Sequence, residues 1–151
     1  MDAVTYPNEE VTQLLNANFV ATKIDITDEN TATYVKQYGQ VWTPTFIYLT
    51  SDGRQLRRSL GYYPPQNMLA ELHIALGYFT LDSGQYAEAY KHFEEAASID
   101  SQLQPEAMYF KGVSAYRRDH DPAGLLTNWR ELAKKYPGSE WWTKASFVGK
   151  E

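Results

Sequence analysis

The sequence contains no cysteine among its 151 residues. This absence excludes disulfide bonds, catalysis by a thiolate of this chain, and metal sites that need a cysteine ligand. Any fold inferred for the chain must therefore be interpreted without thiol chemistry of its own.

Long apolar runs, basic runs and low-complexity segments are also missing. No apolar stretch approaches the ~20 residues that a helix needs to cross a bilayer, so we expect no membrane span. The N-terminal residues Met1-Asp2-Ala3-Val4 have neither the basic region nor the apolar core of a signal peptide. We therefore expect a cytoplasmic protein.

The net charge is −5, and the 14 lysine and arginine residues form only small groups. The densest groups are Arg54, Arg57 and Arg58, and Arg117 and Arg118. Small basic clusters usually lie on a solvated face, so we expect no binding to nucleic acid.

Motifs for catalysis or cofactor binding are absent as well. The histidines His73, His92 and His120 are far apart in the sequence, and none has a second histidine or a carboxylate at metal-ligand spacing. The acidic residues within Asp25–Glu29 lack the glycine and terminal glutamate of a calcium loop, and are better explained as charge at a helix N-terminus. There is no glycine-rich phosphate loop and no nucleophile elbow. We expect no metal, no cofactor and no catalytic set.

The first two-fifths of the chain alternates between helix and strand patterns. Apolar residues at helical spacing, and runs of β-branched and aromatic residues, predict the elements. They are a helix over residues 8–16, a strand over Phe19–Ile26, a helix from Thr27 or Asp28 to Tyr38, and strands over Thr45–Thr50 and Leu56–Tyr62. Asp52-Gly53 predicts a hairpin between the last two strands, and Pro64-Pro65 begins the next helix.

From Leu69 onward every pattern is helical, and glycine or proline separates the helices. The separators are Gly84, Pro105, Asp119-His120-Asp121-Pro122 and Tyr136-Pro137-Gly138, and a short final helix follows over residues 140–147. Tight turns between helices of roughly 12 to 15 residues predict antiparallel pairs.

Residues 75–97 resemble one tetratricopeptide motif. The residues at the family's spacing are Leu76 and Gly77 in a first helix, Gly84 and Tyr86 at a turn, and Ala89, Phe93 and Ala96 in a second helix. Small residues such as Gly77 and Ala89 let two helices approach closely, while Tyr86 and Phe93 fill the space around them.

A second, degenerate copy of the motif follows. Gly112 lies 35 residues after Gly77, close to the ~34-residue period of the family, and Trp129 and Pro137 fall near its aromatic and proline positions. Gly124 replaces the usual alanine, and an aspartate-rich turn replaces the glycine turn. The last helix would cap the array. An unrelated pair of helical hairpins remains the alternative.

Residues 1 to about 76 resemble the thioredoxin superfamily. The matching stretches are Asn18-Phe19-Val20-Ala21-Thr22-Lys23-Ile24-Asp25, Tyr38-Gly39-Gln40-Val41-Trp42-Thr43-Pro44-Thr45, Asp52-Gly53 and Gly61-Tyr62. The resemblance implies a partial thioredoxin-like α/β fold over residues 1–72, followed by all-α tetratricopeptide-like hairpins over residues 73–151. It also implies a cis Pro44 and a peptide-binding loop of Trp42, Thr43 and Pro44, in which the backbone of Thr43 pairs with a bound strand.

The chain departs from the thioredoxin family at its start. In the family, two strands and a helix come before this region, and one of those strands ends at Cys-x-x-Cys. We interpret Met1 as an internal methionine of a longer protein, a few residues after the missing motif. The cysteines would then be cut away with the central strand and not replaced.

Removal of a central strand would leave two rows of backbone hydrogen-bonding groups without partners. Either the flanking elements close up, or the open strand pairs with a second copy of the chain. We favour a homodimer.

These observations predict a redox-inactive thioredoxin-like and tetratricopeptide protein that binds other proteins or peptides as an adaptor or holdase. The alternative is the C-terminal portion of a thiol:disulfide oxidoreductase whose cysteines lie upstream of Met1. An in-frame Cys-x-x-Cys just upstream would favour the enzyme.

The absence of cysteine predicts that the chain does not speed the reduction of insulin by dithiothreitol, because the exchange needs an attacking thiolate. Turbidity of the released insulin chains measures the rate. Acceleration in proportion to the chain's concentration would contradict the prediction.

Overall fold

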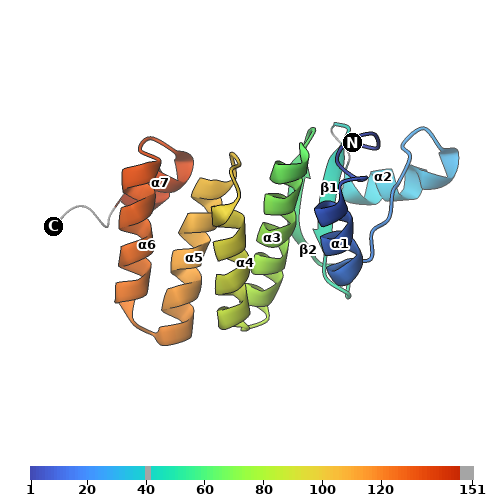
Figure 1. Cartoon of the computed structure of the whole chain (residues 1–151). Coiled ribbons are helices and arrows are strands. Elements are labelled where there is room, and N and C mark those ends of the chain that lie inside the picture. Colours follow the sequence, from blue (N-terminus) through green and yellow to red (C-terminus); the bar gives the residue numbers. More distant parts are fainter. Residues whose placement is uncertain (40–41, 147–151) are drawn as a thin grey trace. The chain divides into compact units, whose positions relative to one another are not determined.

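A computed structural model describes residues 1–39 and 42–146 of the chain. The chain divides into two compact units, Met1–Pro64 and Pro65–Glu151 (Figure 1). Gln40 and Val41 of the thioredoxin-like motif, and Phe147 at the expected end of the last helix, lie outside the described residues. No helix in the described part of the chain is both long enough and apolar enough to cross a membrane.

The first unit contains short helices and a hairpin. Its elements are α1 (Glu9–Asn18), η1 (Glu29–Thr31), α2 (Ala32–Tyr38), β1 (Thr45–Leu49) and β2 (Gln55–Leu60). The Asn8 side chain accepts a hydrogen bond of 3.1 Å from the Val11 amide and so caps α1. Gly39 ends α2 in the left-handed conformation, with a φ of 60°.

The predicted hairpin between β1 and β2 is confirmed. The two strands pair antiparallel, with Thr45 opposite Leu60, and the register shifts between Tyr48 and Leu49. The turn places Gly53 at a φ of 83°, a conformation that glycine adopts without steric cost.

The predicted strand over Phe19–Ile26 is wrong. No strand is assigned there, and the sheet formed by the described residues contains only β1 and β2. Val20 is 100% exposed, and Ile24 and Ile26 are 38% and 46% exposed. A strand is stabilised by hydrogen bonds to a neighbour, and this segment has not closed up onto β1. The segment therefore has the β-branched pattern of a strand but no neighbouring strand with which it pairs.

The second unit consists of helices that lie side by side in chain order (Figure 1). They are α3 (Pro65–Asp82), α4 (Tyr86–Ser98), α5 (Gln104–Asp119), α6 (Pro122–Lys135) and α7 (Glu140–Ala145). Left-handed residues, Gly84 with φ 76° and His120 with φ 54°, end α3 and α5. An α/β N-terminal segment followed by a helical region is therefore the fold class, as the sequence predicts.

Among the glycines that the structure describes in this unit, Gly77 of α3 has the closest neighbour, which is Phe93 of α4. A Cβ atom on Gly77 would lie only 2.7, 2.8 and 2.9 Å from three atoms of the Phe93 ring. Phe93 is fully buried, in a cluster that also contains Ile74, Ala89 and Ala96. The missing side chain of Gly77 therefore provides the space that the ring fills.

Aromatic rings continue this core along the array of helices. The Phe93 ring stacks on Phe110 of α5 at 5.5 Å, and Phe110 contacts Tyr109 at 5.2 Å. Tyr109 stacks on Trp129 of α6 at 4.6 Å and lies 5.2 Å from Trp141 of α7. Such aromatic pairs stabilise a protein beyond the burial of their apolar area. The ring contacts therefore help to hold α4, α5, α6 and α7 together.

Gly77→Ala should destabilise the protein by about 1–2 kcal/mol, although alanine is the better helix former by about 1 kcal/mol. The clash with the Phe93 ring outweighs this gain, since overpacking costs about 1–3 kcal/mol. In a Phe93→Leu background, the same substitution should be neutral or stabilising. Urea unfolding of the two pairs of proteins measures both effects, and an equal cost in both backgrounds would refute the close contact.

Candidate functional site

The loop before β1 presents an aromatic side chain to solvent. Trp42 is 67% exposed, and the Thr43–Pro44 peptide bond is cis. The Thr45 hydroxyl donates a hydrogen bond to the Trp42 carbonyl, and the Gly61 amide donates one of 2.9 Å to the Pro44 carbonyl. The loop is thus held at the start of β1 and at the end of β2, with the indole ring on the surface.

Arg58 of β2 supports the approach to this loop. One guanidinium nitrogen of Arg58 donates a 2.7 Å hydrogen bond to the Tyr38 carbonyl, and the other donates to the Gly39 carbonyl. A cation that satisfies the last carbonyls of a helix stabilises its C-terminus. The expectation that this basic cluster is only a solvated face is therefore wrong for Arg58. Its side chain fixes the end of α2 against β2.

Exposed apolar side chains are concentrated in the first unit. Nine of the twelve exposed large hydrophobic residues that the structure describes lie before Pro65: Val4, Val20, Ile24, Ile26, Tyr34, Trp42, Leu49, Leu60 and Tyr62. The helix α2 has no buried residue. Unusual exposure of apolar surface marks interaction sites in soluble proteins.

The residues of the tetratricopeptide-like pattern lie mostly inside the second unit. Gly77 meets Phe93, and Gly112 of α5 meets Trp129, whose ring atoms would lie 3.0 Å from an added Cβ. The Trp129 indole donates a 3.0 Å hydrogen bond to the Tyr109 carbonyl. Leu76, Ala89 and Ala96 are buried, Gly84 is in the turn before α4, and Pro137 follows α6. These residues position helices and do not form an exposed site.

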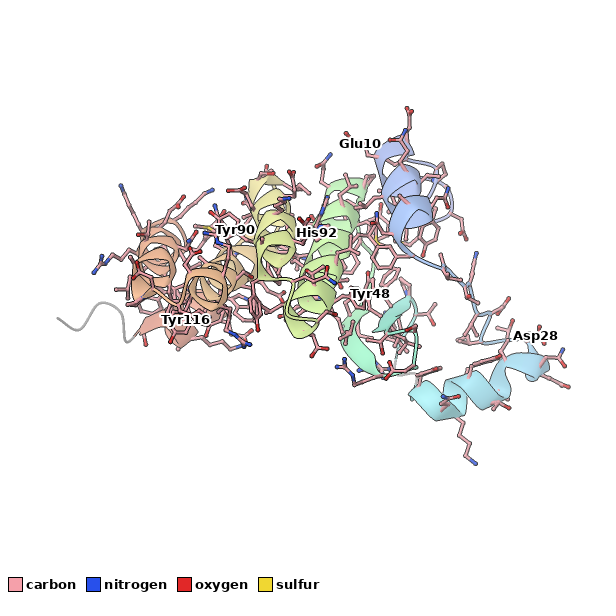
Figure 2. The ribbon with its side chains drawn as sticks, turned by 90° about the horizontal axis from the view of Figure 1, so that it is seen from below. Glu10, Asp28, Tyr48, Tyr90, His92 and Tyr116 are labelled. Atoms are coloured by element: carbon pink, nitrogen blue, oxygen red, sulfur yellow. The ribbon has the colours of Figure 1, made fainter. Side chains whose placement is uncertain are left out.

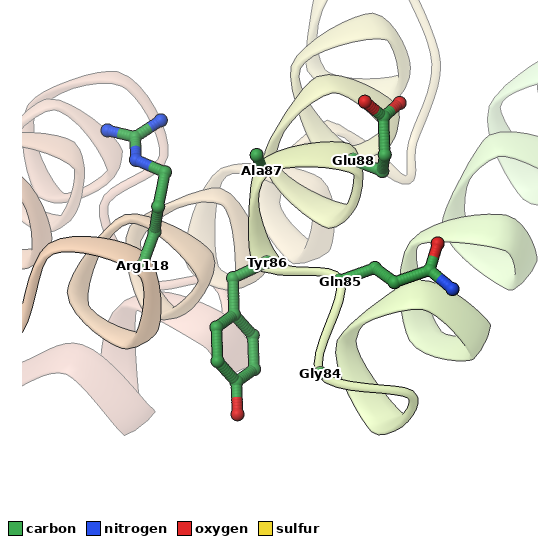
Figure 3. A pocket seen from close by; sticks show the side chains of 6 residues that line it. All are labelled: Gly84, Gln85, Tyr86, Ala87, Glu88 and Arg118. Carbon is green, nitrogen blue, oxygen red and sulfur yellow. The ribbon is translucent and has the colours of Figure 1, made fainter.

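Tyr86 is the exception, because it begins α4 beside a surface hollow. The hollow is open to solvent and is lined by Gly84, Gln85, Tyr86, Ala87, Glu88 and Arg118 (Figure 3). Arg118 pairs with Asp119 at 2.7 Å and lies 4.9 Å from the centre of the Tyr90 ring. The Tyr86 hydroxyl accepts a hydrogen bond from Arg117. The cations beside the hollow therefore already have partners within the protein.

The structure brings two of the histidines together. His73 of α3 and His92 of α4 are far apart in the sequence, yet their Nδ1 atoms lie 3.3 Å apart. His92 and Tyr90 both project from α4 (Figure 2), two positions apart, so they face nearly opposite sides of the helix. Tyr90 contacts α5 while His92 contacts α3. A helical hairpin brings such residues together, and no local sequence pattern marks the pair.

Burial keeps this histidine pair neutral. Desolvation, followed by repulsion from His92, lowers the pKa of His73 to about 4. The pKa of His92 is lowered as well, mainly by desolvation, although Glu88 and Glu95 oppose the shift. Among the described residues, no group of three or more histidine, cysteine, aspartate or glutamate residues is arranged to hold a metal ion.

Residues 1–75 match the family model of a thioredoxin-like domain. The search of curated proteins and the search of solved structures found no match. The N-terminal half of the chain therefore carries a thioredoxin-like domain, as the motifs around Asn18–Asp25 and Trp42–Thr45 predict.

The histidine pair predicts a loss of stability in acid. Between pH 6.5, the ordinary pKa, and about 4, the unfolded chain binds protons on His73 that the folded chain does not. The free energy of unfolding should therefore fall as the pH drops through this range.

Urea denaturation at about pH 7.5 and about pH 5 measures the loss. A His73→Gln, His92→Gln double variant should lose less stability between these values than the parent does. His120→Gln, which changes the third histidine, serves as the control and should behave like the parent. Equal pH dependence in the parent and the double variant would contradict the assignment.

Proposed function

We propose that this chain, whose N-terminal half carries a thioredoxin-like domain, is a protein-binding module that acts as an adaptor or holdase. The sequence contains no cysteine, so the chain has no thiol for disulfide exchange. Its activity in this proposal is the binding of other polypeptides and not a reaction.

The observation that carries the proposal is the exposure of large apolar side chains before Pro65. Single exposed apolar side chains are common on stable monomers, whereas their concentration in one part of the chain favours a surface that receives another polypeptide. Trp42 stands out among them, because it is large, 67% exposed and held in a loop whose ends are hydrogen-bonded to the hairpin. Tryptophan is also enriched among residues that dominate binding energy.

The proposed mode of binding is addition of an extended strand next to the Trp42–Pro44 loop and β1. In such complexes, backbone hydrogen bonds provide affinity, and exposed side chains such as an indole provide selectivity. The sheet of the described residues has only two strands, so each strand has an edge that faces away from the hairpin. This arrangement favours extended, apolar segments, as found in unfolded chains.

We further propose that the helices from Pro65 onward form two tetratricopeptide-type hairpins. Two similar contacts support this: Gly77 meets Phe93, and Gly112 meets Trp129, with the glycines 35 residues apart and the aromatic residues 36 apart. Gly124 of α6, 35 residues after Ala89, is also tightly packed, since an added Cβ would lie 2.9 Å from the Ala115 Cβ. In each hairpin, a glycine of the first helix therefore lies against an aromatic ring of the second helix.

A second candidate function is the C-terminal portion of a thiol:disulfide oxidoreductase. The match of residues 1–75 to a thioredoxin-like domain favours it, since that chemistry is the best-known use of the fold. In this case, the thiols would be supplied by residues outside this sequence.

A single assay separates the two functions. In dithiothreitol-induced aggregation of insulin, a holdase at equimolar concentration should delay and reduce turbidity, whereas the C-terminal portion of an oxidoreductase, which has no thiol in this sequence, should leave the turbidity unchanged. Trp42→Ser should lose at least half of the suppression because it removes the exposed indole. Trp142→Ser, which removes a tryptophan that is 37% exposed in the second unit, is the matched control. No delay by the parent chain, or full suppression by Trp42→Ser, would refute the proposal.

A further inference from the structure

The histidine pair between α3 and α4 has the spacing of two ligands to one metal ion. The Nδ1 atoms of His73 and His92 lie 3.3 Å apart, with the ring centres 5.6 Å apart and the ring planes tilted by 39°. Two imidazole nitrogens that bind a tetrahedral zinc ion, each at about 2.0–2.1 Å, are separated by about 3.3–3.4 Å. The two side chains therefore already have the separation that such an ion requires.

A hydrogen bond between the two rings is the other arrangement that this spacing allows. One Nδ1 would carry a hydrogen and the other would accept it, and 3.3 Å is long for such a bond. A zinc ion needs a lone pair on both Nδ1 atoms, with the hydrogens on the two Nε2 atoms. A turn of each ring about its Cβ–Cγ bond would aim both lone pairs at an ion beside the line that joins the nitrogens. The ion would thus replace only a long hydrogen bond.

The pair is accessible, and its nitrogens are free of competing protons. Both histidines are half-buried, so part of each residue remains open to solvent. Desolvation lowers the pKa of both, that of His73 to about 4. Because a metal binds the neutral imidazole, protons compete little with it near pH 7.

The charged groups around the pair come from α4 and are negative on balance. Glu88 and Glu95 lie four residues before and three residues after His92, on the same face of the helix. Both act to raise the pKa of His92, whereas Lys91, which pairs with Glu88 at 2.8 Å, acts to lower it. The residues three and four positions from His73 on α3 are uncharged: Leu69, Ala70, Leu76 and Gly77. The charged neighbours of the pair therefore favour a cation over an anion.

We propose that His73 and His92 bind one zinc ion through their Nδ1 atoms, and that this ion clamps α3 to α4. Among the described residues, no group of three or more metal-ligating side chains surrounds such an ion, so water completes the tetrahedron. The ion therefore exchanges with solvent and binds more weakly than at a structural site with four protein ligands. The unfolded chain, in which 19 residues separate the two histidines, does not hold them together, so zinc stabilises the fold. The proposal does not depend on polypeptide binding at Trp42.

Isothermal titration calorimetry of the full chain with zinc chloride, without a histidine tag and at about pH 7.5, tests the site. The parent should bind one ion per chain. His73→Gln and His92→Gln should each lower the affinity at least about ten-fold, because each leaves a single imidazole. His120→Gln, which changes the histidine outside the pair, is the matched control and should bind like the parent. Magnesium chloride should give no heat of binding, since Mg²⁺ prefers oxygen ligands.

Nitrogen-15 NMR of the imidazole rings in the parent identifies the ligating atoms without any substitution. On addition of zinc, the Nδ1 resonances of both His73 and His92 should shift, and both rings should carry their hydrogen on Nε2. The His120 resonances should not change. In thermal unfolding, excess zinc should raise the midpoint of the parent and of His120→Gln, but not that of either pair variant.

The absence of zinc binding by the parent would overturn the proposal. Equal affinity in the parent and in both pair variants would overturn it as well. A zinc-dependent shift of only one ring, or of the Nε2 atoms in place of Nδ1, would refute the bridging geometry. A chain that binds no zinc but still suppresses insulin aggregation would refute the zinc site alone and leave the proposed function intact.

Discussion

The helical half of the molecule depends on one steric constraint, the absence of a side chain at Gly77. Three atoms of the Phe93 ring lie within 3.0 Å of the position that a Cβ would occupy. This close approach positions α4 against α3, and the ring of Phe93 then starts the aromatic series through Phe110 and Tyr109 to Trp129. Because protein interiors are close-packed, each ring fixes the next helix, and the histidine pair is a consequence of the same hairpin.

The N-terminal half differs from the helical half. Its helix caps and its turn form as the sequence predicts, but few contacts join parts of it that are distant in the sequence. Asn8 caps α1, Arg58 holds the end of α2, and the hairpin has the predicted turn. Yet the stretch from Val20 to Asn30 is exposed throughout. Order within each element does not bury enough apolar surface to complete a domain. The proposed binding of other polypeptides rests on this imbalance.

Local chemistry explains which features the sequence could predict. Turn and cap residues such as Gly39, Gly53 and Gly84 act within a few positions, so the elements that they end were predicted correctly. The Phe19–Ile26 strand was not, because strand formation needs a partner that no local pattern can supply. The contact of His73 with His92, and the role of Arg58, depend on tertiary packing and were likewise missed. The periodic pattern did mark Gly77, Phe93, Gly112 and Trp129 as motif positions, and the structure shows that Gly77 meets Phe93 and Gly112 meets Trp129.

The central claim is that a well-packed helical unit is joined to a thioredoxin-like unit with an unpaired, strand-like surface. Hydrogen exchange of the intact chain at high dilution, followed by mass spectrometry, tests it most directly. Peptides from α3 to α6 should exchange slowly, while those covering residues 20–26 should exchange at nearly the rate of an unstructured chain. Adding a polypeptide that binds should then protect the N-terminal peptides. Strong protection of residues 20–26 in the dilute monomer would contradict the account.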